Sequence, residues 1–398
     1  MTTNAARFRK AAGPDKTLLE FGLRRAQGPD GGISASRYAF MGGFDGTSNI
    51  LAGKLFKDIS VSGTNAHSFI TSYAMLEDVK SSTIRAPDGA EVEFVALCEK
   101  YRTEEALMAV VVCAGEFAAF IGYAQAFPAH FLVLVDTYDT LKSGIPNFIA
   151  VALALMEVGH KPVGIRLDSG DLAYLSKEAR RMFQEADTAF PDRLKSLASC
   201  TIVASNDINE PVLISLKEQD HDIDAFGIGT NLVTCQAQPA LGMVFKLVEV
   251  NGLPRIKLSQ EVAKVTVPGK KQVYRLLGRD GVPIVDLMVR EGVDPVPAPG
   301  ATTSCRHPAD DKKQVNVRPT TVVPMLQPVW VGKGFQAFVS AFESISALKS
   351  YAQLQLTTIR DDHLRPLNPT PYKVSVGADF YKFIHDLWEK EAPVPLLE

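Results

Sequence analysis

The stretch PVGIRLDSGDLAYLSKEARRM (residues 162–182) passes from a short apolar segment through a polar cluster into a helical pattern. A buried strand followed directly by a helix is the repeating unit of an α/β fold. Arg166, Asp168, Ser169 and Asp171 stand where the strand should end, and charged groups are costly there unless they are paired, solvated or used. The stretch therefore predicts a βα unit whose strand ends in a polar site.

The same order of strand and polar cluster, usually followed by a helix, occurs elsewhere along the chain. The segments with this pattern span residues 58–68, 130–140, 162–171, 200–210 and 224–232. Strands that alternate with helices are parallel, and either an open doubly wound sheet or a closed α/β barrel would hold them. In both folds ligands bind at the carboxyl ends of the strands, where these polar clusters fall.

The sequence pattern changes after about residue 240. Strand pairs are expected around the turn sequences NGLP (251–254) and GRDG (278–281), and residues 335–360 have helical spacing. We therefore predict two regions: a core of parallel strands and helices over residues 1–241, and a β-rich, partly helical region over residues 242–398.

The composition is that of a protein able to bury a full core, since 46% of the 398 residues are hydrophobic and 22% are charged. The formal net charge of −3 argues against a general nucleic-acid binder, which would carry a basic excess. The five cysteines are scattered and none has zinc-site spacing. We therefore expect reduced thiols in a cytoplasmic protein.

Two segments resemble membrane or targeting segments by composition. Residues 109–127 form the longest apolar run, but an interior Glu and Gln favour a buried helix over a membrane span. The basic residues 1–13 could belong to a transit peptide. They run into TLLEFGLRRA (17–26), whose leucines have helical spacing, so we expect a helix there that belongs to the folded body.

The segment FGIGTNLVT (226–234) places Gly227, Gly229 and Thr230 at the end of a predicted strand. Glycines allow backbone N–H groups to approach a phosphate closely, and the Thr hydroxyl adds a donor. The same glycines could serve only the geometry of a βα turn. Neither a P-loop nor a Rossmann fingerprint is present in the sequence.

In RLDSGD (166–171), Arg166 and Asp168 are two residues apart on a strand and therefore face the same way. They could form an ion pair that only joins strand to helix, with Ser169 or Asp171 as the helix N-cap. An Arg at the rim of a pocket can also bind a carboxylate or phosphate through two parallel hydrogen bonds, or stack on an aromatic ring. The Asp would suit sugar hydroxyls or a metal ion.

Acidic and amide side chains follow two further strands, at Asp136 and Asp139 and at Ser205, Asn206 and Asp207. Each cluster alone could be a turn or a helix start. Their repetition at successive strand ends, around a candidate phosphate site, favours a sugar phosphate with Mg²⁺, which binds few protein carboxylates and keeps water ligands. The pattern does not identify the metal ligands.

Two further features have weaker patterns. His67 follows a Gly-Thr strand end, where a lone His is most often structural. Residues 19–49 are rich in glycine and contain Arg24, Arg25 and Arg37. This segment is therefore either a set of ordinary turns or a loop that binds a polyanion.

Eight motifs occur in one order along the chain: LRRAQGPDGG, GGFDGTSNILAG, GTNAHSF, LVDTYDT, GIRLDSGDL, SND, GIGT and KVTVPGKKQVYRL. Together they resemble the nicotinate phosphoribosyltransferase family of type II phosphoribosyltransferases, from about residue 3 to the C-terminus. The resemblance implies an irregular, TIM-like α/β barrel with a β-rich second region. It also implies a homodimer.

The resemblance implies that phosphoribosyl passes from phosphoribosyl pyrophosphate to nicotinate, giving nicotinate mononucleotide and pyrophosphate in NAD salvage. ATP would be a co-substrate, hydrolysed through phosphorylation of His67, and Mg²⁺ (or Mn²⁺) would be the metal cofactor. No nucleic acid or membrane is expected as a partner. Loss of pyrophosphate from the anomeric carbon gives an oxocarbenium-like centre, so the protein needs orientation and charge stabilisation more than a nucleophile.

The resemblance also assigns roles to residues at the matching positions. His67, Arg166 and Asp168 are the expected catalytic residues; Arg166 would pair with or stack on nicotinate, and Asp168 would bind ribose hydroxyls. Arg24 would hold the pyrophosphate with Mg²⁺, and the glycine-threonine turn would hold the 5′-phosphate. The expected substrate-binding residues are Arg24, Ser48, Thr64, Asp136, Asn206, Gly227, Gly229 and Thr230.

Ser48 bears on the choice of substrate. Relatives that use nicotinamide carry an Asp at this position, which would repel the carboxylate of nicotinate, whereas a neutral Ser would not. The resemblance therefore favours nicotinate over nicotinamide. Quinolinate is a weaker alternative, because its second carboxylate would require further cationic residues and would not require phosphorylation of His67.

Family members carry an N-terminal segment before the position that matches Thr3, and this segment supplies a Tyr to the nicotinate pocket. We therefore keep a second expectation beside the active enzyme. It is an inactive or weakly active short form that binds phosphoribosyl pyrophosphate or pairs with full-length subunits. An assay of the chain itself separates the two.

Overall fold

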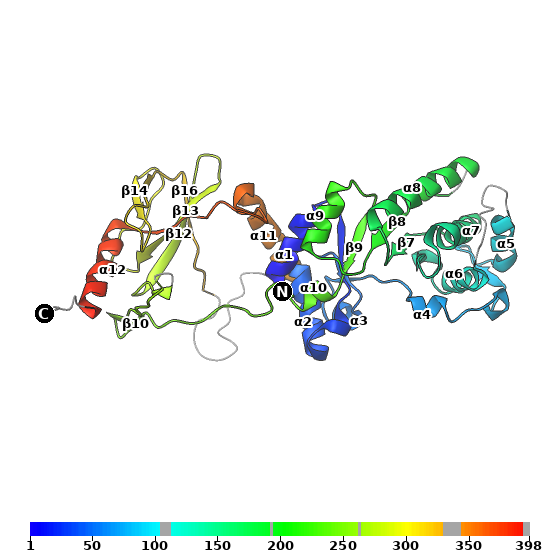
Figure 1. Cartoon of the computed structure of the whole chain (residues 1–398), viewed down its shortest axis with the longest axis horizontal. Helices are drawn as coiled ribbons and strands as arrows, with labels where there is room; N and C mark the ends of the chain where they lie inside the picture. Colours follow the sequence, from blue (N-terminus) through cyan, green and yellow to red (C-terminus); the bar gives the residue numbers. More distant parts are fainter. Residues whose placement is uncertain (104–112, 192–193, 262–263, 329–343, 393–398) are drawn as a thin grey trace. The chain divides into compact units, whose positions relative to one another are not determined.

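The computed structural model describes residues 1–103, 113–191, 194–261, 264–328 and 344–392. The chain divides into two compact units, Met1–Pro239 and Ala240–Glu398. Each unit has its own sheet (Figure 1). Each unit also has its own hydrophobic core. The division lies close to the position where the sequence pattern changes.

The first unit is built on a seven-stranded sheet in the order β3-β2-β1-β9-β8-β7-β6, and every neighbouring pair is parallel. The strands are β1 (Thr17–Glu20), β2 (Gly46–Thr47), β3 (Ser60–Val61), β6 (Leu132–Leu134), β7 (Gly164–Leu167), β8 (Thr201–Ala204) and β9 (Ala225–Ile228). Among the described residues no pairing joins β3 to β6, so the sheet forms a half-barrel. The predicted α/β class is confirmed.

Two groups of helices bury separate clusters of apolar side chains against this sheet. The larger cluster lies among β6, β7, β8 and the helices α5 (Phe94–Thr103), α6 (Ala114–Ala126), α7 (Ile145–Val158) and α8 (Leu172–Ala189) (Figure 1). The second lies among β1, β9 and the helices α1 (Thr2–Ala12), α2 (Gly28–Met41), α9 (Glu210–Glu218) and α10 (Thr230–Val233). Shorter elements are α3 (Ile50–Leu55), α4 (His67–Ile70), β4 (Thr83–Arg85) and β5 (Glu91–Glu93).

Helix α7 is almost wholly buried. Pro146 in its first turn and the left-handed Gly159 after its last residue mark its limits. Among the described residues, Thr140–Val158 is the one helical stretch long and apolar enough to cross a membrane by length and composition. Because 83% of the stretch is buried inside the unit, its apolar composition is explained by its place in the core.

The segment TLLEFGLRRA (17–26) is not the helix predicted from its leucines. Leu18 and Leu19 lie in β1, near the middle of the sheet. A parallel strand carries consecutive apolar residues because both of its faces are buried, and a run this short cannot be told from part of a helix by spacing. Leu23 lies in a single 3₁₀ turn, η1 (Leu23–Arg25).

Residues 19–49, predicted to form turns or a loop, contain the 14-residue helix α2. Pro29 near its start fits the first turn of a helix, where the missing N–H has no partner to lose. Gly42 follows the last residue of α2 and lies against α1, since a Cβ there would be 2.5 Å from the Thr2 carbonyl oxygen. Gly42 therefore allows α2 and α1 to pack closely together.

The second unit contains a six-stranded sheet in the order β15-β14-β17-β13-β12-β16 and a β10–β11 hairpin, so its β-rich character is confirmed. Its strands are β10 (Glu249–Val250), β11 (Leu253–Pro254), β12 (Lys271–Leu277), β13 (Pro283–Arg290), β14 (Thr303–Arg306), β15 (Gln314–Val317), β16 (Thr321–Pro324) and β17 (Val374–Val376). Asn251 and Gly252, with φ of 51° and 75°, form the β10–β11 turn. The sequence at 278–281 connects β12 to β13.

Two predicted helices extend beyond the residues that the structure describes. The run 109–127 contains α6, which begins at Ala114, and residues 109–112 lie outside the described residues. The segment 335–360 contains α11 (Ile345–Thr358), and its first part also lies outside them. The last helix, α12 (Ala378–Glu391), packs on the sheet of the second unit.

Candidate active site

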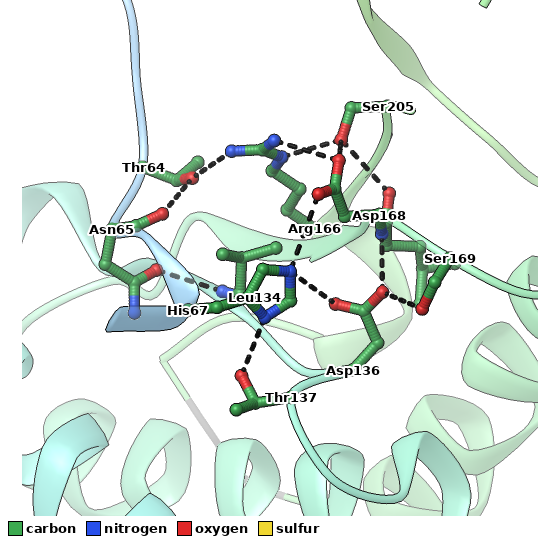
Figure 2. A network of polar contacts seen from close by, with 11 residues as sticks. Thr64, Asn65, His67, Leu134, Asp136, Thr137, Arg166, Asp168, Ser169 and Ser205 are labelled. Atoms are coloured by element: carbon green, nitrogen blue, oxygen red, sulfur yellow. Dashed lines mark hydrogen bonds and ion pairs between the residues drawn. The ribbon is translucent and has the colours of Figure 1, made fainter. Parts of the chain in front are cut away.

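Polar side chains from four parts of the first unit meet at the carboxyl ends of β6, β7 and β8 (Figure 2). Parallel strands place their carboxyl ends along one edge of a sheet, so residues far apart in the sequence converge there. The residues that meet are Thr64, Asn65, His67, Asp136, Thr137, Arg166, Asp168, Ser169 and Ser205.

Arg166 is the central cation of this network. Its Nε donates to Ser205 Oγ (2.7 Å), and its Nη1 donates to Thr64 Oγ1 (3.1 Å). Its Nη2 donates to Asp168 Oδ1 (3.0 Å). The guanidinium carbon lies 5.3 Å from the centre of the Phe21 ring. Three of the five N–H donors of Arg166 are thus used within the protein, and two remain for an anionic ligand.

Asp168 is the carboxylate that pairs with Arg166. Partial burial is the largest single influence and raises the pKa of Asp168. The hydrogen bond from Ser205, the charge and hydrogen bond of Arg166 and the charge of His67 together outweigh it, so the pKa lies below the ordinary 3.8. Asp168 is therefore ionised at neutral pH and balances the guanidinium charge.

His67 begins α4 and faces two carboxylates. Its Nδ1 lies 3.1 Å from Thr137 Oγ1, and its Nε2 lies 3.5 Å from Asp168 Oδ2 and 4.0 Å from Asp136 Oδ1. Asn65, two residues earlier, accepts a hydrogen bond from the backbone N–H of Leu134 and so holds this segment against β6 (Figure 2). The side chain of His67 is 42% exposed, so the ring can still meet a ligand.

Asp136 holds the turn that follows β7. Its Oδ2 accepts hydrogen bonds from the backbone N–H of Asp168 (2.8 Å) and from Ser169 Oγ (2.6 Å). Its side chain is only 1% exposed, and its Oδ1, which faces His67, has no hydrogen-bond partner among the described residues. Asp136 Oδ1 therefore keeps an acceptor position directed at the His67 ring.

Two of the acidic residues at strand ends serve as caps. Asp139 accepts hydrogen bonds from the backbone N–H groups of Leu141 and Lys142, in the turn before α7. Asp171 accepts from the backbone N–H of Tyr174 at the start of α8. The prediction that Ser169 or Asp171 is the N-cap of this helix is therefore confirmed for Asp171.

Comparison with known proteins identifies the family. The sequence model of the nicotinate phosphoribosyltransferase (NAPRTase) family matches residues 154–280, and that of the nicotinate phosphoribosyltransferase C-terminal domain matches residues 270–384. Nicotinate phosphoribosyltransferase 1 of Arabidopsis thaliana is 52% identical over 99% of this chain and 71% of that protein. The chain belongs to the nicotinate phosphoribosyltransferase family.

Two further comparisons agree with this assignment. The nicotinate phosphoribosyltransferase of Dictyostelium discoideum is 48% identical over 99% of this chain and 67% of that protein. The crystal structure of human nicotinic acid phosphoribosyltransferase superposes with a TM-score of 0.81 and 38% identity, over 97% of this chain and 73% of that chain. The family resemblance drawn from the eight motifs is confirmed.

In this member of the nicotinate phosphoribosyltransferase family, the glycine-threonine turn lies at the carboxyl end of β9. Gly227 is buried within β9, and a Cβ on it would lie 2.4 Å from a ring carbon of Phe21. Gly229 precedes α10, where a Cβ would lie 3.1 Å from the Phe21 carbonyl oxygen, and Thr230 is the first residue of that helix. Gly227 thus has a packing role that the sequence pattern did not indicate.

The other predicted substrate-binding residues of this family member lie at the surface. Arg24, in η1, and Asn206, after β8, are exposed and make no side-chain hydrogen bond or ion pair with other described residues. Asn206 and Asp207 have left-handed backbones, with φ of 84° and 47°. Ser48 is exposed after β2, and its backbone N–H donates to the Glu20 carbonyl oxygen (3.0 Å).

Sequence reasoning missed Glu20 and Phe21, at the end of β1. Glu20 is 1% exposed and accepts hydrogen bonds from Ser36 Oγ (2.7 Å), Thr47 Oγ1 (2.6 Å) and the backbone N–H of Gly22. It thereby fixes the end of β1 to α2 and β2. The sequence did indicate these residues, because a Glu and a Phe close the apolar run that forms β1. They were missed because this run was interpreted as helix.

Proposed function

We propose that this protein transfers phosphoribosyl from phosphoribosyl pyrophosphate to nicotinate, giving nicotinate mononucleotide and pyrophosphate for NAD salvage. Relatives that carry the name nicotinate phosphoribosyltransferase, at 52% and 48% identity, support the proposal. The observation that carries it is the Arg166–Asp168 pair at the carboxyl edge of the sheet, with the Phe21 ring beside the guanidinium.

The reaction needs opposite charges at fixed positions. Nicotinate is a flat aromatic carboxylate, and Arg166 offers two unused N–H donors beside the Phe21 ring, which suits pairing and stacking together. As pyrophosphate leaves, positive charge develops on the ribose, and the ionised Asp168 is the acceptor for ribose hydroxyls close to that charge. The hydrogen bonds from Ser205 and Arg166 hold this carboxylate in place before substrate arrives.

The phosphates would bind at the neighbouring strand ends. Gly229 and Thr230 would hold the 5′-phosphate, and the exposed Arg24 would approach the pyrophosphate. The described residues contain no group of three or more His, Cys, Asp and Glu side chains able to hold a metal. We propose that Mg²⁺ (or Mn²⁺) is held mainly by substrate oxygens and water, since this ion binds few protein carboxylates. The metal would neutralise charge on the leaving pyrophosphate.

ATP coupling would act through His67. The γ-phosphoryl group of ATP passes to a ring nitrogen, ADP leaves, and water later releases inorganic phosphate. Phosphorylation replaces an imidazole that faces Asp136 and Asp168 by an anion beside the same carboxylates. The changed repulsion would alter how the site holds its substrates, which is the differential interaction that coupling requires.

A His67→Ala variant tests the coupling and the function together. The wild-type protein should form nicotinate mononucleotide faster with ATP than without it, and the variant should keep the basal rate and lose the increase. His160→Ala is the matched control, since His160 is a surface residue whose Nε2 contacts the Arg85 carbonyl oxygen, away from the site. If ATP still raises the reaction rate of the His67→Ala variant, phosphorylation of this residue is excluded as the cause of the increase. Phosphoribosyl pyrophosphate binding without any product would favour the binding-only alternative.

Ser48→Asp tests the choice of the acid over the amide. The variant should raise the KM for nicotinate about ten-fold, because a carboxylate a few ångströms from another costs roughly 1–4 kcal/mol. Ser48→Asn is the control, because Asn has nearly the same shape as Asp but no charge. It should change the KM for nicotinate about two-fold at most. Equal KM values for the Asp and Asn variants would place Ser48 away from the nicotinate carboxylate.

We further infer a homodimer in the cytoplasm. All five cysteines are free, and Cys98, Cys200 and Cys305 are buried, which fits a reducing compartment. The family resemblance supports the dimer. Sedimentation of the purified chain would report its subunit number directly, and fluorescence microscopy of a tagged chain would report its compartment.

A further inference from the structure

Glu116 is a carboxyl group buried in the core of the first unit. It lies in the first turn of α6 and is 0% exposed. Its Oε2 accepts hydrogen bonds from Ser143 Oγ (2.5 Å) and Asn147 Nδ2 (3.0 Å). Its Oε1 has no partner among the described residues, and no cation is paired with it there. A buried acid without a cation is costly, so a specific use is expected.

Ser143 belongs to a π-helical turn, Thr140–Gly144, which joins the end of β6 to α7. Its Oγ also accepts a hydrogen bond from the backbone N–H of Cys113 (3.0 Å). Two residues at the start of α6, Cys113 and Glu116, therefore bond to the Ser143 hydroxyl and fix the turn to that helix. On the other side, the Asp139 carbonyl oxygen accepts from the N–H groups of Ser143 and Gly144. Such turns are rare and are frequently found at functional sites.

This turn directly follows two residues of the candidate active site. Asp136 and Thr137 lie between β6 and the turn, and both face the His67 ring, at 4.0 Å and 3.1 Å. Gly144 packs directly against the end of β6, since a Cβ there would lie 1.8 Å from the Val135 carbonyl oxygen. Movement of the turn would therefore move the backbone that carries Asp136 and Thr137.

We propose that Glu116 is a positioning residue, which holds through Ser143 the turn from which Asp136 and Thr137 reach His67. The inference rests on the proposed function, because it assigns Glu116 a part in the same reaction. Glu116 touches no substrate; it acts on the site through the backbone at the end of β6. A displacement of about 1 Å at a reacting group can lower a rate as much as a hundred-fold.

The chemistry of the buried carboxyl fits this role. Burial raises the pKa of Glu116 to about 7, against the lowering effect of the Ser143 and Asn147 hydrogen bonds and with a smaller contribution from the charges of Asp136 and Asp139. Near neutral pH the group can therefore carry a proton on Oε1 while Oε2 keeps both of its hydrogen bonds. A neutral amide of the same shape should hold the turn equally well.

Glu116→Ala and Glu116→Gln test the proposal against Ile121→Ala, a fully buried position of the same helix. Glu116→Ala should lower the kcat measured with ATP about ten-fold and leave the KM for nicotinate within about two-fold, because His67 loses its fixed partners while Arg166 stays in place. It should also speed amide hydrogen exchange over residues 136–144. Glu116→Gln should stay within about three-fold of wild type in kcat and keep the exchange slow. Ile121→Ala should lose stability without either change.

Several outcomes would overturn the proposal. Unchanged exchange over residues 136–144 in Glu116→Ala would show that the carboxyl does not hold the turn. If Glu116→Gln loses as much activity as Glu116→Ala, the charge of the carboxylate matters and not the hydrogen bonds by which it holds the turn. If Glu116→Ala does not fold, Ser143→Ala removes only the linking hydroxyl and should give the same two changes. A wild-type chain without product would refute the proposed function, while the exchange data would still test the support of the turn.

Discussion

An Arg166→Ala variant is expected to form nicotinate mononucleotide with a kcat/KM about a thousand-fold below that of the wild-type protein. Arg166 is the cation at the centre of the site, and its remaining donors lie beside the Phe21 ring. The variant leaves the Asp168 carboxylate partly buried without this cation, so the groups proposed to hold the nicotinate carboxylate and the ribose are both disturbed. Steady-state kinetics with each substrate varied in turn would measure the loss.

Arg180→Ala is the matched control for this variant. The Arg180 side chain is 15% exposed, against 18% for Arg166, and it pairs with Asp224 at 2.7 Å. It also donates to the carbonyl oxygens of Ala198 and Cys200, just before β8 and so at the opposite edge of the sheet. The Asp224 side chain is 46% exposed, so the removal of Arg180 should lower the free energy of unfolding by roughly 1–3 kcal/mol, mainly through the lost hydrogen bonds to the two carbonyl oxygens. The kcat/KM of its folded fraction should stay within about three-fold of wild type.

Arg166→Lys separates charge from shape. A Lys ammonium keeps the positive charge but cannot form the planar set of hydrogen bonds that Arg166 makes to Ser205, Thr64 and Asp168. We therefore expect Lys to recover less than about a tenth of the lost activity. Wild-type kinetics in Arg166→Ala would mean that the polar cluster at the end of β7 is structural, as a simple strand-to-helix ion pair would be.

The polar edge of the sheet could be predicted because its cause is local. Each cluster directly follows an apolar run, and parallel strands bring such clusters to one edge whatever the length of the helices between them. Arg166 and Asp168, two residues apart, face the same way for the same reason, and they pair at 3.0 Å. Position along a strand was therefore enough to predict that these two side chains lie together at the sheet edge.

The roles of Asp136 and Asp139 could not be separated from the sequence. Both follow β6, three residues apart, in one short polar segment. Asp139 accepts from backbone N–H groups two and three residues later, which is local geometry. Asp136 accepts from the backbone N–H of Asp168, 32 residues away. The Asp136 carboxylate and the Asp168 N–H meet only because β6 pairs with β7, and this contact cannot be predicted from spacing in the sequence.

The end of β1 was missed for the same reason. Glu20 is stabilised by hydroxyl groups of Ser36 and Thr47, so its burial depends on two segments that are distant in the sequence. Phe21 reaches the guanidinium of Arg166 only because β1 and β9 are neighbours and Gly227 leaves space for the ring. Contacts of this kind arise from tertiary packing, which overrides the local spacing of the leucines.

Gly227→Ala is expected to lower the free energy of unfolding by about 1–3 kcal/mol and kcat/KM about a hundred-fold. The new Cβ would lie 2.4 Å and 2.5 Å from two ring carbons of Phe21, closer than atoms can approach, so the ring must move. The ring lies beside the Arg166 guanidinium, and its displacement would disturb the place proposed for nicotinate. Thermal unfolding and steady-state kinetics of the purified variant would measure the two effects.

Combining Gly227→Ala with Phe21→Leu tests whether this contact is the cause. Leu lacks the ring atoms that meet the new Cβ, so the double variant should be more stable than the sum of the two single losses predicts, by about 1 kcal/mol. Its activity should stay low, because no aromatic ring then faces Arg166. Strictly additive losses would instead mean that Gly227 is required for another reason. Close approach of its backbone to a phosphate, the first interpretation of the glycine pattern, would then be the explanation to test.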